Sequence, residues 1–415
     1  MTLSESLGWR GFIKDKTFDD TDWLDEPRTF YLGSDCSSDS LTIGNLAVYM
    51  LARHLADAGW KTVLLVGGAT SLIGDPGGKD AERPLKTTEE IAHNVAGVEA
   101  QVRKLFAHNQ FELVNNHDWF KDIGYLEFLR EVGKHFSMTE LTQRDFIATR
   151  MGEGGGGISY AEFSYNLIQG YDYYWLFKNK GVVLQIGASD QWGNMLSGVP
   201  LIRKKAGAEV HALCMPLVID QKTGKKFGKS EAGAVWLDPS KTTPTQFYQF
   251  WINVEDNRVE DFLKLYTLLS KENIEKLMQQ HREEPKLRLA QEHLAMAVTQ
   301  LVHGDLQTST AREVTEVIKN PQAIALADRP GVLESLRKEI ASASSPPDGK
   351  IADALTAANL AESKTEARRL LADGAITING TRVIRERFEP GDFQGGRLLI
   401  RKGKILKNTA LIESA

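Results

Sequence analysis

The sequence predicts an α/β fold in which a parallel-sheet domain is followed by an all-helical domain and a small C-terminal α/β domain. Three observations predict this order. The first ~220 residues alternate short apolar runs with helical periodicity, which is typical of a parallel sheet covered by helices. From about Pro244 to Ile340 only helical patterns follow one another. A Ser- and Pro-rich stretch over 342–349 then precedes a compact last segment.

Strands and helices alternate in the first domain, and their bounds follow from the apolar runs and the turn residues that end them. The expected strands are Thr29–Gly33, Thr62–Val66, Val182–Ile186 and Leu213–Ile219, and the expected helices are Ile43–Ala58, 87–108, 122–150, Ala161–Lys178 and Gln191–Lys205. Ligands of such sheets bind at the carboxyl ends of the strands. The turns that follow these four strands are therefore the expected location of a site.

A chain of 415 residues is too long for one hydrophobic core, so two or three domains are expected. The patterns favour a sheet domain over 1–225, a lysine loop and helical domain over 226–341, a linker over 342–349 and a C-terminal domain over 350–415. The last domain holds 12 Lys and Arg against 8 Asp and Glu, whereas the whole chain has a net charge of −5. A local positive excess on an acidic protein is typical of an RNA-binding appendage.

Composition is that of an ordinary soluble globular protein, with 42% hydrophobic and 25% charged residues. Cys36 and Cys214 are too few for a disulfide framework or a cysteine-based zinc site, which indicates a reducing compartment. No run reaches the ~18 apolar residues of a membrane span. Acidic residues near the start, such as Glu5 and Asp15, are atypical of a secretory or mitochondrial leader. We therefore expect a cytoplasmic protein without a membrane partner.

The glycine-rich turn after Val66 is the first candidate site. Over 67–83 it places five glycines, several carboxylates and two cations at the carboxyl end of a strand. Lys79 and Arg83 lie one helical turn apart if a helix begins there. The glycine spacing does not fit a Walker loop. A site for an anion and an ammonium group is favoured over a flexible glycine loop, which would leave Asp75 and Arg83 unexplained.

Two further turns carry chemistry that suits a nucleotide. After Gly33, a helix begins near Thr42, which is a good N-cap. Gly44, in its first turn, lets a phosphate approach the backbone N–H groups and the positive end of the helix dipole. After the next predicted strand, Gly187 permits close approach and Asp190, three residues on, suits the two hydroxyls of a ribose.

The predicted helix Ala161–Lys178 places three informative polar residues on one face. Tyr165, Gln169 and Asp172 lie at i, i+4 and i+7 and therefore project together. A phenol, an amide and a carboxylate fit a small polar or zwitterionic ligand. A stripe that merely faced solvent would favour Lys and Glu.

Two lysines, Lys226 and Lys229, frame an exposed loop with polar, turn-forming neighbours. Lysines spaced three apart can bring two ammonium groups onto one phosphate chain. Alone, such a loop is usually a solvated turn. The nucleotide site predicted upstream gives these lysines a target.

The chain resembles the bacterial-type tyrosyl-tRNA synthetases, a family of class I aminoacyl-tRNA synthetases, over essentially its whole length. The matching segments occur in the family's order and are Tyr31–Asp35, Leu65–Asp75, Phe163–Asp172, Gln185–Asn194, Lys226–Ser230 and Phe247–Asn253. The fifth of these corresponds to the family's KMSKS signature, and Glu366–Gly380 resembles an S4-like RNA-binding module. The resemblance implies a Rossmann-type catalytic domain, a helical domain and an S4-like tail.

The resemblance also implies roles for individual residues. Tyr31 and Asp172 would bind the phenol of L-tyrosine, and Tyr160 matches a position in the family's subunit interface, which implies a homodimer. The remaining roles are the ammonium site (Asp75, Tyr165, Gln169, with Thr70 beside it), ATP contacts (Gly33, Asp35, Gly44, Gly187, Asp190, Lys229) and pyrophosphate contacts (Lys79, Arg83, Lys226, Lys229). A separate hypothesis concerns the basic residues of the tail, which are candidate tRNA phosphate contacts or simply a solvated basic surface: Arg368, Arg369, Arg401, Lys402 and Lys404.

The implied activity is that of a tyrosine–tRNA ligase. The tyrosine carboxylate would attack the α-phosphorus of ATP in line, releasing pyrophosphate, and the tyrosyl group would pass to the 3′ end of tRNA. ATP would be a substrate accompanied by Mg²⁺, and no protein-bound metal is expected. Catalysis would rest on positioning and on stabilisation of phosphate charge.

One departure concerns the family's HIGH signature, where Thr42 and Asn45 replace the two histidines. Both residues can still donate hydrogen bonds and remain candidate catalytic residues. A noncatalytic RNA-binding homologue is one alternative, but the tyrosine pocket is otherwise intact. The related tryptophanyl enzyme is another, which the phenol-binding pair Tyr31 and Asp172 disfavours.

Overall fold

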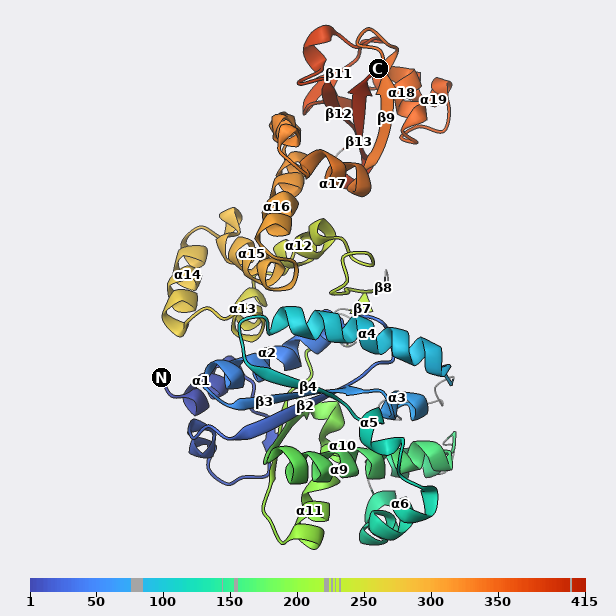
Figure 1. Cartoon of the computed structure of the whole chain (residues 1–415). Helices are drawn as coiled ribbons and strands as arrows, with labels where there is room; N and C mark the ends of the chain where they lie inside the picture. Colours follow the sequence, from blue (N-terminus) through green and yellow to red (C-terminus); the bar gives the residue numbers. More distant parts are fainter. Residues whose placement is uncertain are drawn as a thin grey trace. The chain divides into compact units, whose positions relative to one another are not determined.

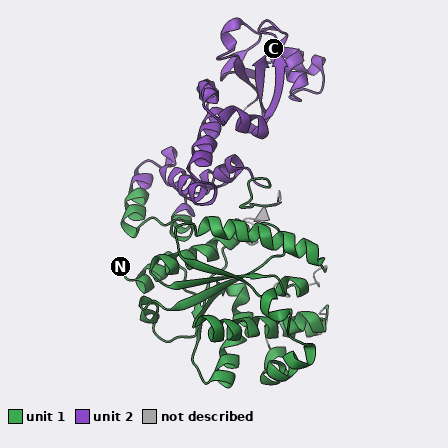
Figure 2. Ribbon diagram, in the orientation of Figure 1, with its two compact units in different colours: residues 1–241, 260–279 green, residues 242–259, 280–415 purple. Residues whose placement is uncertain are grey.

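The structure is a computed structural model that describes residues 1–75, 85–143, 145–152, 156–219, 224, 227, 229–230, 233–403 and 405–415. They form two compact units, shown in Figure 2. Unit 1 comprises Met1–Lys241 and Glu260–Gln279, and unit 2 comprises Thr242–Val259 and Gln280–Ala415. The segment predicted as one helical domain is therefore shared between the units. The finer division into three domains remains a prediction.

A six-stranded sheet forms the centre of unit 1, in the order β1-β6-β5-β2-β3-β4. β2 to β6 run parallel, and the short β1 pairs antiparallel with β6. Their bounds are β1 (Asp15–Lys16), β2 (Thr29–Asp35), β3 (Lys61–Gly67), β4 (Phe111–Asn115), β5 (Leu184–Ala188) and β6 (His211–Met215). The predicted α/β class with a parallel sheet is confirmed.

Helices cover both faces of this sheet: α2 and α4 lie over one face, and α9, α10 and α11 over the other (Figure 1). Tyr31 and Val63 pack with Tyr173 and Leu176 of α9. Strands buried on both faces read as continuous apolar runs, which is why β2 and β3 were visible in the sequence. The helices of unit 1 are α1 (Leu3–Arg10), α2 (Ile43–Asp57), α3 (Thr70–Ile73), α4 (Thr88–Leu105), α5 (His117–Phe120), α6 (Tyr125–Glu131), α7 (Met138–Thr142), α8 (Asp145–Met151), α9 (Tyr160–Lys180), α10 (Trp192–Met195), α11 (Gly198–Ala206) and α13 (Val259–Tyr266), which begins one residue before its second segment.

The boundaries of α9 show why its prediction succeeded. The Ser159 side chain accepts the Glu162 N–H and caps the amino end, and Gly181 ends the helix in the left-handed region at φ +67°. Both are standard helix signals, because glycine tolerates that conformation and serine satisfies a free N–H. The observed bounds differ from the predicted Ala161–Lys178 by one residue at the start and two at the end.

Several predicted elements differ from the structure. The helix predicted over 122–150 is broken into α6, α7 and α8. Near the middle of that range, Ser137 caps the amino end of α7. The helix predicted over Gln191–Lys205 breaks between α10 and α11 at the fully buried Ser197. The last predicted strand of this sheet ends early, at Met215, just before Pro216, which lacks the N–H of a strand interior. β4 was not predicted, since its five residues are all only half-buried.

Unit 2 joins a set of helices to a five-stranded sheet of order β11-β10-β12-β13-β9. Ile351, Leu371, Ile400 and Ile412 are among the residues of its last hydrophobic core. The elements are α12 (Pro244–Ile252), α15 (Leu289–His303), α16 (Asp305–Lys319), α17 (Val332–Glu339), α18 (Ile351–Ala357), α19 (Lys364–Ala372), β9 (Ala341–Ser345), β10 (Ile376–Ile378), β11 (Thr381–Val383), β12 (Arg397–Lys402) and β13 (Thr409–Ser414), while α14 (Lys271–Glu283) spans the boundary at Gln279.

The predicted linker over 342–349 is wrong in its first half. Residues up to Ser345 belong to β9, which pairs in parallel with β13 from Ala341↔Ala410 to Ser345↔Ser414. Serine and alanine carry no strand signal, and this strand forms because β13 offers it an open edge. No helix in the described part of the chain is long and apolar enough to cross a membrane.

Candidate active site

The strand order of the unit 1 sheet reverses between β2 and β5, and this position defines the candidate site. From β2 the chain proceeds outward through β3 to β4, and from β5 outward to β6 on the other side. The carboxyl ends of β2 and β5 therefore face a crevice in which α/β sheets bind ligands. Gly33 and Asp35 lie at the end of β2, and Gly187 lies in β5 just before the turn that holds Asp190.

Asp172 of α9 is a buried carboxylate held by two side chains from the segment after β4. Its Oδ1 accepts a hydrogen bond from the Trp119 indole at 2.9 Å, and its Oδ2 accepts one from the Asn116 amide at 3.1 Å. Burial raises the pKa of Asp172 to about 8, against the opposing effect of these two hydrogen bonds. Asp172 therefore holds a proton far more readily than an exposed carboxyl group.

The Tyr31 hydroxyl lies in the same buried environment. It has no hydrogen-bond partner among the described residues, although its residue is only 1% exposed. Burial raises the Tyr31 pKa well above its usual value, and the charge of Asp172 adds to that effect. A buried polar group without a partner costs free energy, so such a group commonly marks the position of a ligand atom.

A second cluster joins the ends of β2 and β3 to α9. The Tyr165 hydroxyl donates to Asp35 Oδ2 at 2.8 Å. A Cβ atom on Gly67 would lie 2.2 Å from Thr70 Oγ1 and 2.8 Å from Asp35 Oδ1, so only glycine leaves room for both side chains. Thr70 is buried and accepts a hydrogen bond from Asn116 at 3.3 Å.

Asp75 is also buried, and two side chains from the segment after β5 hold it. Gln191 Nε2 donates to Asp75 Oδ2 at 2.5 Å, and Asn194 Nδ2 donates to Asp75 Oδ1 at 3.2 Å. Gln169 is half-buried on the same face of α9 as Tyr165 and Asp172, as predicted from their spacing. The structure thus gathers amide and carboxylate groups suited to an ammonium ion next to the crevice.

The amino end of α2 carries Thr42 and Asn45, the two residues that replace the family's histidines. The Thr42 hydroxyl donates to Asn45 Oδ1 at 2.9 Å, and the Thr42 backbone N–H donates to the same atom at 3.0 Å. The Asn45 carbonyl oxygen is thereby held against its own helix. Asn45 is exposed, and its amide nitrogen is the group left to act as a donor at the positive end of the helix dipole.

The lysine loop approaches this helix through Phe227. A Cβ atom on Gly44 would lie 3.5 Å from the Phe227 carbonyl oxygen, and the Phe227 N–H donates to Val218 O at 2.8 Å. The Phe227 ring packs against Phe262 of α13 with ring centroids 4.4 Å apart. Lys229 begins the short β7 (Lys229–Ser230), which pairs with β8 (Gly233–Ala234). Lys79, Arg83 and Lys226 lie outside the described residues.

Two of the predicted glycines differ in their surroundings. Around Gly33, a Cβ atom would meet only ordinary contacts, at 3.7 Å from Leu65 and 3.8 Å from Tyr31. At Gly187, it would lie 2.8 Å from the Met195 sulfur, so this glycine is also required by packing. Asp190 is exposed at the crevice, in a 3-10 turn (Ser189–Gln191).

Comparison with known proteins identifies the family. Residues 24–319 match the family described as tRNA synthetases class I (W and Y). The chain belongs to the class I tRNA synthetases. Residues 333–411 of this synthetase match a domain described as the tyrosine–tRNA ligase SYY-like C-terminal domain. The predicted enzyme class is therefore confirmed.

Curated relatives match this synthetase over almost its whole length. It is 40% identical to the tyrosine–tRNA ligase of Lactobacillus johnsonii over 411 residues, which is 97% of each chain. It is 39% identical to tyrosine–tRNA ligase 2 of Bacillus cereus over the full length of both chains. The predicted resemblance to bacterial tyrosyl-tRNA synthetases is thus confirmed.

Solved structures agree with this fold. A C-terminally truncated mitochondrial tyrosyl-tRNA synthetase from Aspergillus nidulans is 29% identical, with a TM-score of 0.67, and the match covers 75% of this synthetase and 92% of that chain. The Archaeoglobus fulgidus tyrosyl-tRNA synthetase is only 16% identical, with a TM-score of 0.53 over 75% of this chain and 99% of that one, and supports the fold alone.

Four residues that hold the site carboxylates were not predicted from the sequence. Asn116 and Trp119 lie 56 and 53 residues from Asp172, and Gln191 and Asn194 lie 116 and 119 residues from Asp75. Asn116 follows the unpredicted β4, so no predicted strand end drew attention to it. Gln191 and Asn194 stand in a turn that the strand-end rule had already selected.

The five candidate tRNA contacts in the tail fall into separate groups. Arg368 and Arg369 of α19 are exposed. Arg401 donates to Thr409 Oγ1 and to the carbonyl oxygen of Ile318, and Lys402 pairs with Glu366 at 2.9 Å. Arg401 and Lys402 are therefore engaged in contacts within unit 2. Lys404 lies outside the described residues.

The described part of the synthetase contains no group of three or more His, Cys, Asp or Glu side chains arranged to hold a metal ion. Both cysteines are buried and free, and burial raises the pKa of each thiol to about 12. A thiol with such a pKa stays protonated near neutral pH and is a poor nucleophile. Neither thiol is therefore expected to act as a nucleophile.

Proposed function

We propose that this class I synthetase activates L-tyrosine with ATP to form tyrosyl-adenylate and transfers the tyrosyl group to the 3′ end of tRNA. The observation that carries the proposal is the buried Tyr31 hydroxyl, which has no hydrogen-bond partner in the described part of the chain and lies near the buried Asp172. A ligand that brings a hydroxyl group to this place would donate to one of these residues and accept from the other. Among the amino acids that this family activates, tyrosine has such a group and tryptophan has not.

In this proposal Tyr31 and Asp172 bind the tyrosine phenol, and Asp75, Tyr165 and Gln169 hold its ammonium group. Asp75 is already oriented by two amides, so its carboxylate can accept from the ammonium group without rearrangement. Phenylalanine would leave the buried phenol-binding groups unpaired. Tyrosyl-tRNA synthetase is itself the standard example of this discrimination.

ATP would occupy the crevice at the ends of β2 and β5. The exposed backbone at Gly33 leaves space for the nucleotide, and Asp190 stands where it can accept from the ribose hydroxyls. We assign Asp35, Gly44 and Gly187 to the same substrate. Mg²⁺ would enter bound to the ATP phosphates, since phosphate oxygens and water are the ligands that it prefers.

The reaction needs no nucleophile from the protein. The tyrosine carboxylate oxygen forms a bond to the α-phosphorus as the bond to the bridging oxygen of pyrophosphate breaks in line. Thr42, Asn45 and the positive end of α2 face one side of the phosphates in this proposal. The lysine loop supplies Lys226 and Lys229 on the other, with Lys79 and Arg83 added from the glycine-rich turn.

Thr42 and Asn45 would act as a unit rather than as two separate donors. Because the Thr42 hydroxyl and N–H both donate to Asn45 Oδ1, the asparagine amide nitrogen is directed away from its helix. This fixed donor would take part of the role that the family's histidines play. The lysines would then supply most of the positive charge.

A homodimer is supported by an exposed apolar surface on unit 1. The side chains Tyr125, Leu126, Met138, Met151 and Tyr160 are each more than half exposed. The Tyr125 hydroxyl donates to that of Tyr160 at 3.2 Å, so at least two of them form one patch. Large exposed apolar side chains of this kind mark interfaces. Sedimentation of the protein as a monomer at micromolar concentration would exclude this assembly.

We propose a cytoplasmic location, where tRNA, ATP and reducing conditions coincide. The two buried free cysteines support this location. The proposed tRNA contacts are the exposed Arg368 and Arg369.

Tyrosine-dependent exchange of pyrophosphate into ATP tests the proposed reaction. We expect exchange with tyrosine that requires Mg²⁺, and little exchange with phenylalanine or tryptophan. Exchange with tryptophan in place of tyrosine would favour the tryptophanyl alternative. Folded protein that bound tRNA but gave no exchange would favour the noncatalytic homologue.

A further inference from the structure

The chain that leaves the lysine loop returns directly to the turn that enters α2. Just after β8, the Ile43 N–H donates to Val235 O at 3.1 Å, and the Leu237 N–H donates to Leu41 O at 2.9 Å. Thr42 and Trp236 form a β-bridge between these two bonds. The segment that follows the lysine loop is thus joined by backbone hydrogen bonds to the turn that enters α2.

The pairing extends to the second lysine of the loop. Lys229 pairs with Ala234 in the β7–β8 hairpin, and Ala234 directly precedes Val235. The register of 235–237 on 41–43 therefore fixes where the Lys229 backbone lies relative to Thr42. A slip of one residue in this pairing would move Lys229 by about 3 Å along the strand direction.

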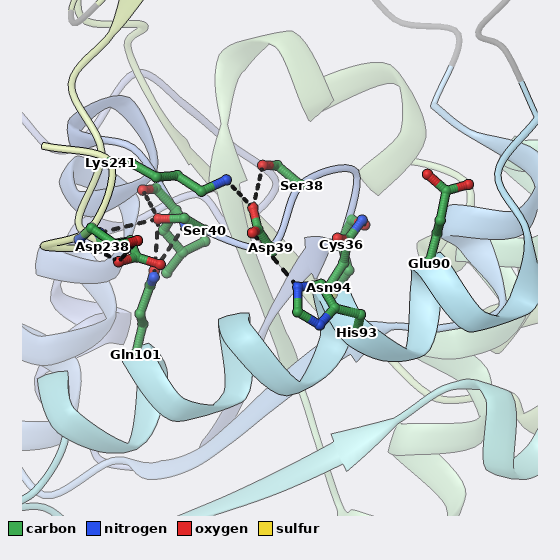
Figure 3. A network of polar contacts seen from close by, with 12 residues as sticks. Cys36, Ser38, Asp39, Ser40, Glu90, His93, Asn94, Gln101, Asp238 and Lys241 are labelled. Atoms are coloured by element: carbon green, nitrogen blue, oxygen red, sulfur yellow. Dashed lines mark hydrogen bonds and ion pairs between the residues drawn. The ribbon is translucent and has the colours of Figure 1, made fainter.

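A group of five residues, here named the clasp, holds this pairing in place; it consists of Asp39, Ser40, Gln101, Asp238 and Lys241. Ser40 is buried, and its Oγ accepts from Gln101 Nε2 at 2.9 Å and from the Asp238 N–H at 3.2 Å. Gln101 Oε1 accepts the Leu41 N–H at 2.8 Å. Figure 3 shows that these groups come from three parts of the chain: the 36–41 turn, α4, and the segment after the loop.

An ion pair closes the other end of the clasp. Lys241 Nζ donates a hydrogen bond to Asp39 Oδ1, and this bond is the main reason that the pKa of Asp39 is lowered. Ser38 donates to the same oxygen at 3.2 Å, and His93 of α4 lies 3.8 Å from the other one. A Cβ atom on Gly97 would lie 2.2 Å from the Asp39 carbonyl oxygen, so α4 packs directly against this turn.

We propose that the clasp is a positioning device for adenylate formation: it sets the register between the lysine-loop exit and the α2 turn, so that Lys229 and Asn45 act on the same phosphate groups. The inference rests on the proposed function. The Asp39 and Lys241 side chains are 29% and 30% exposed, and an ion pair at that exposure contributes little to global stability. Small errors in the placement of catalytic groups nevertheless cost large factors in rate.

Lys241→Met and Asp39→Asn test the proposal, with Lys180→Met as the matched control. Lys180 pairs with Glu112 at similar exposure, 27% and 40%, on a different part of the same sheet domain. For the two clasp variants we expect kcat for tyrosine-dependent exchange to fall about tenfold. The KM for tyrosine should stay within about twofold, because the tyrosine pocket does not include the clasp. The Lys180→Met variant should match the unmodified protein.

Amide hydrogen exchange gives a readout that does not depend on activity. In Lys241→Met the Ile43 and Leu237 amides should lose protection, whereas amides of β3 should keep theirs. The charge-swapped variant Asp39→Lys with Lys241→Asp should recover protection and most of the lost kcat. Unchanged kcat in both single variants, or a loss of kcat with unchanged protection at Ile43 and Leu237, would overturn the proposal.

Tyrosine-dependent exchange by the unmodified protein distinguishes a failure of the proposed function from a failure of the clasp inference. If it shows no tyrosine-dependent exchange, the proposed function fails, whatever the variants do. If it exchanges and the single clasp variants exchange equally well, the proposed function stands and the clasp inference fails.

Discussion

At the scale of single residues, Tyr31 and Tyr173 present the same side chain in two states within one core cluster. Their ring centroids lie 5.3 Å apart. The Tyr173 hydroxyl donates to His211 O at 2.7 Å, whereas that of Tyr31 has no partner among the described residues. The first is satisfied by the fold, and the second is available to a ligand.

Replacing each tyrosine by phenylalanine should therefore have opposite effects. Tyr31→Phe should leave the unfolding free energy unchanged or higher, because it removes an unsatisfied buried group, and should raise the KM for tyrosine about tenfold. Tyr173→Phe should cost about 1 kcal/mol of stability and leave that KM nearly unchanged. Thermal unfolding and exchange kinetics measure both. A stability loss in Tyr31→Phe as large as in Tyr173→Phe would contradict this assignment.

The buried Asp172 predicts a specific pH dependence of stability. Its pKa is raised from 3.8 in an ordinary aspartate to about 8 in the fold. Between these two values the folded protein binds a proton that the unfolded chain has lost, so its contribution to the unfolding free energy falls as pH rises. Below about pH 4 the contribution is fully present.

The Asp172→Asn variant removes this titration and keeps a side chain of similar size. Denaturant unfolding of the ligand-free protein between pH 5 and 8 should show a steeper loss of stability in the unmodified protein than in the variant. Parallel pH profiles would show that Asp172 does not take up a proton on folding.

At the scale of elements, α1 acts as a cap on α13. Arg10, at the end of α1, is 5% exposed and donates to the carbonyl oxygens of Lys264, Thr267 and Leu269 at 2.8, 3.1 and 2.5 Å. The last carbonyl groups of a helix have no partner within the helix, so this guanidinium supplies what α13 lacks. Burial lowers the Arg10 pKa to about 10, and the group remains charged at neutral pH.

Arg10→Met should lower the unfolding free energy by about 2–4 kcal/mol, because several carbonyl groups lose a charged donor in a buried place. Arg28→Met offers a control, since Arg28 also donates to two carbonyl oxygens, those of Trp23 and Glu26, but is much more exposed. Urea unfolding of both variants measures the difference. Equal losses would contradict a special role for the buried cap.

Sequence periodicity predicted the elements that carry strong local signals. β2, β3, α2 and α9 were found within about two residues because apolar runs and helix caps mark them. The edge strand β4 and the strand β9 were missed, since their residues become strand only through a neighbour. The same limit applies to the site: spacing on one helix identified Tyr165, Gln169 and Asp172, whereas the partners Asn116 and Trp119 come from a different element.

At the scale of the whole molecule, the tail cannot simply be cut away to test its role. Leu399 and Leu411 of its sheet share a hydrophobic cluster with Val314, Val317 and Leu336 of the helices before it. Deleting the residues after Ser345 would expose that cluster and leave β9 without β13. Point substitutions are therefore the better test.

The double variant Arg368→Gln with Arg369→Gln should weaken tRNA charging and leave tyrosine-dependent exchange unchanged. Loss of two phosphate contacts should also make the plot of log K for tRNA binding against log salt concentration less steep, by about two units of slope. Filter binding over a range of salt concentrations measures the slope. Lys338→Gln, which breaks an exposed pair with Glu334, is a control that should change neither property.

The interleaved connectivity of the two units has a consequence for synthesis on the ribosome. The chain leaves unit 1 at Lys241 and returns at Glu260, so unit 1 is incomplete until residue 279 has emerged. By then α12 has been made, whose Phe247 and Trp251 are fully buried in the finished protein and which packs against the later helices α15 and α16. A translating chain must therefore carry an uncovered apolar helix while its first unit closes, which is a period of exposure to chaperones and to aggregation.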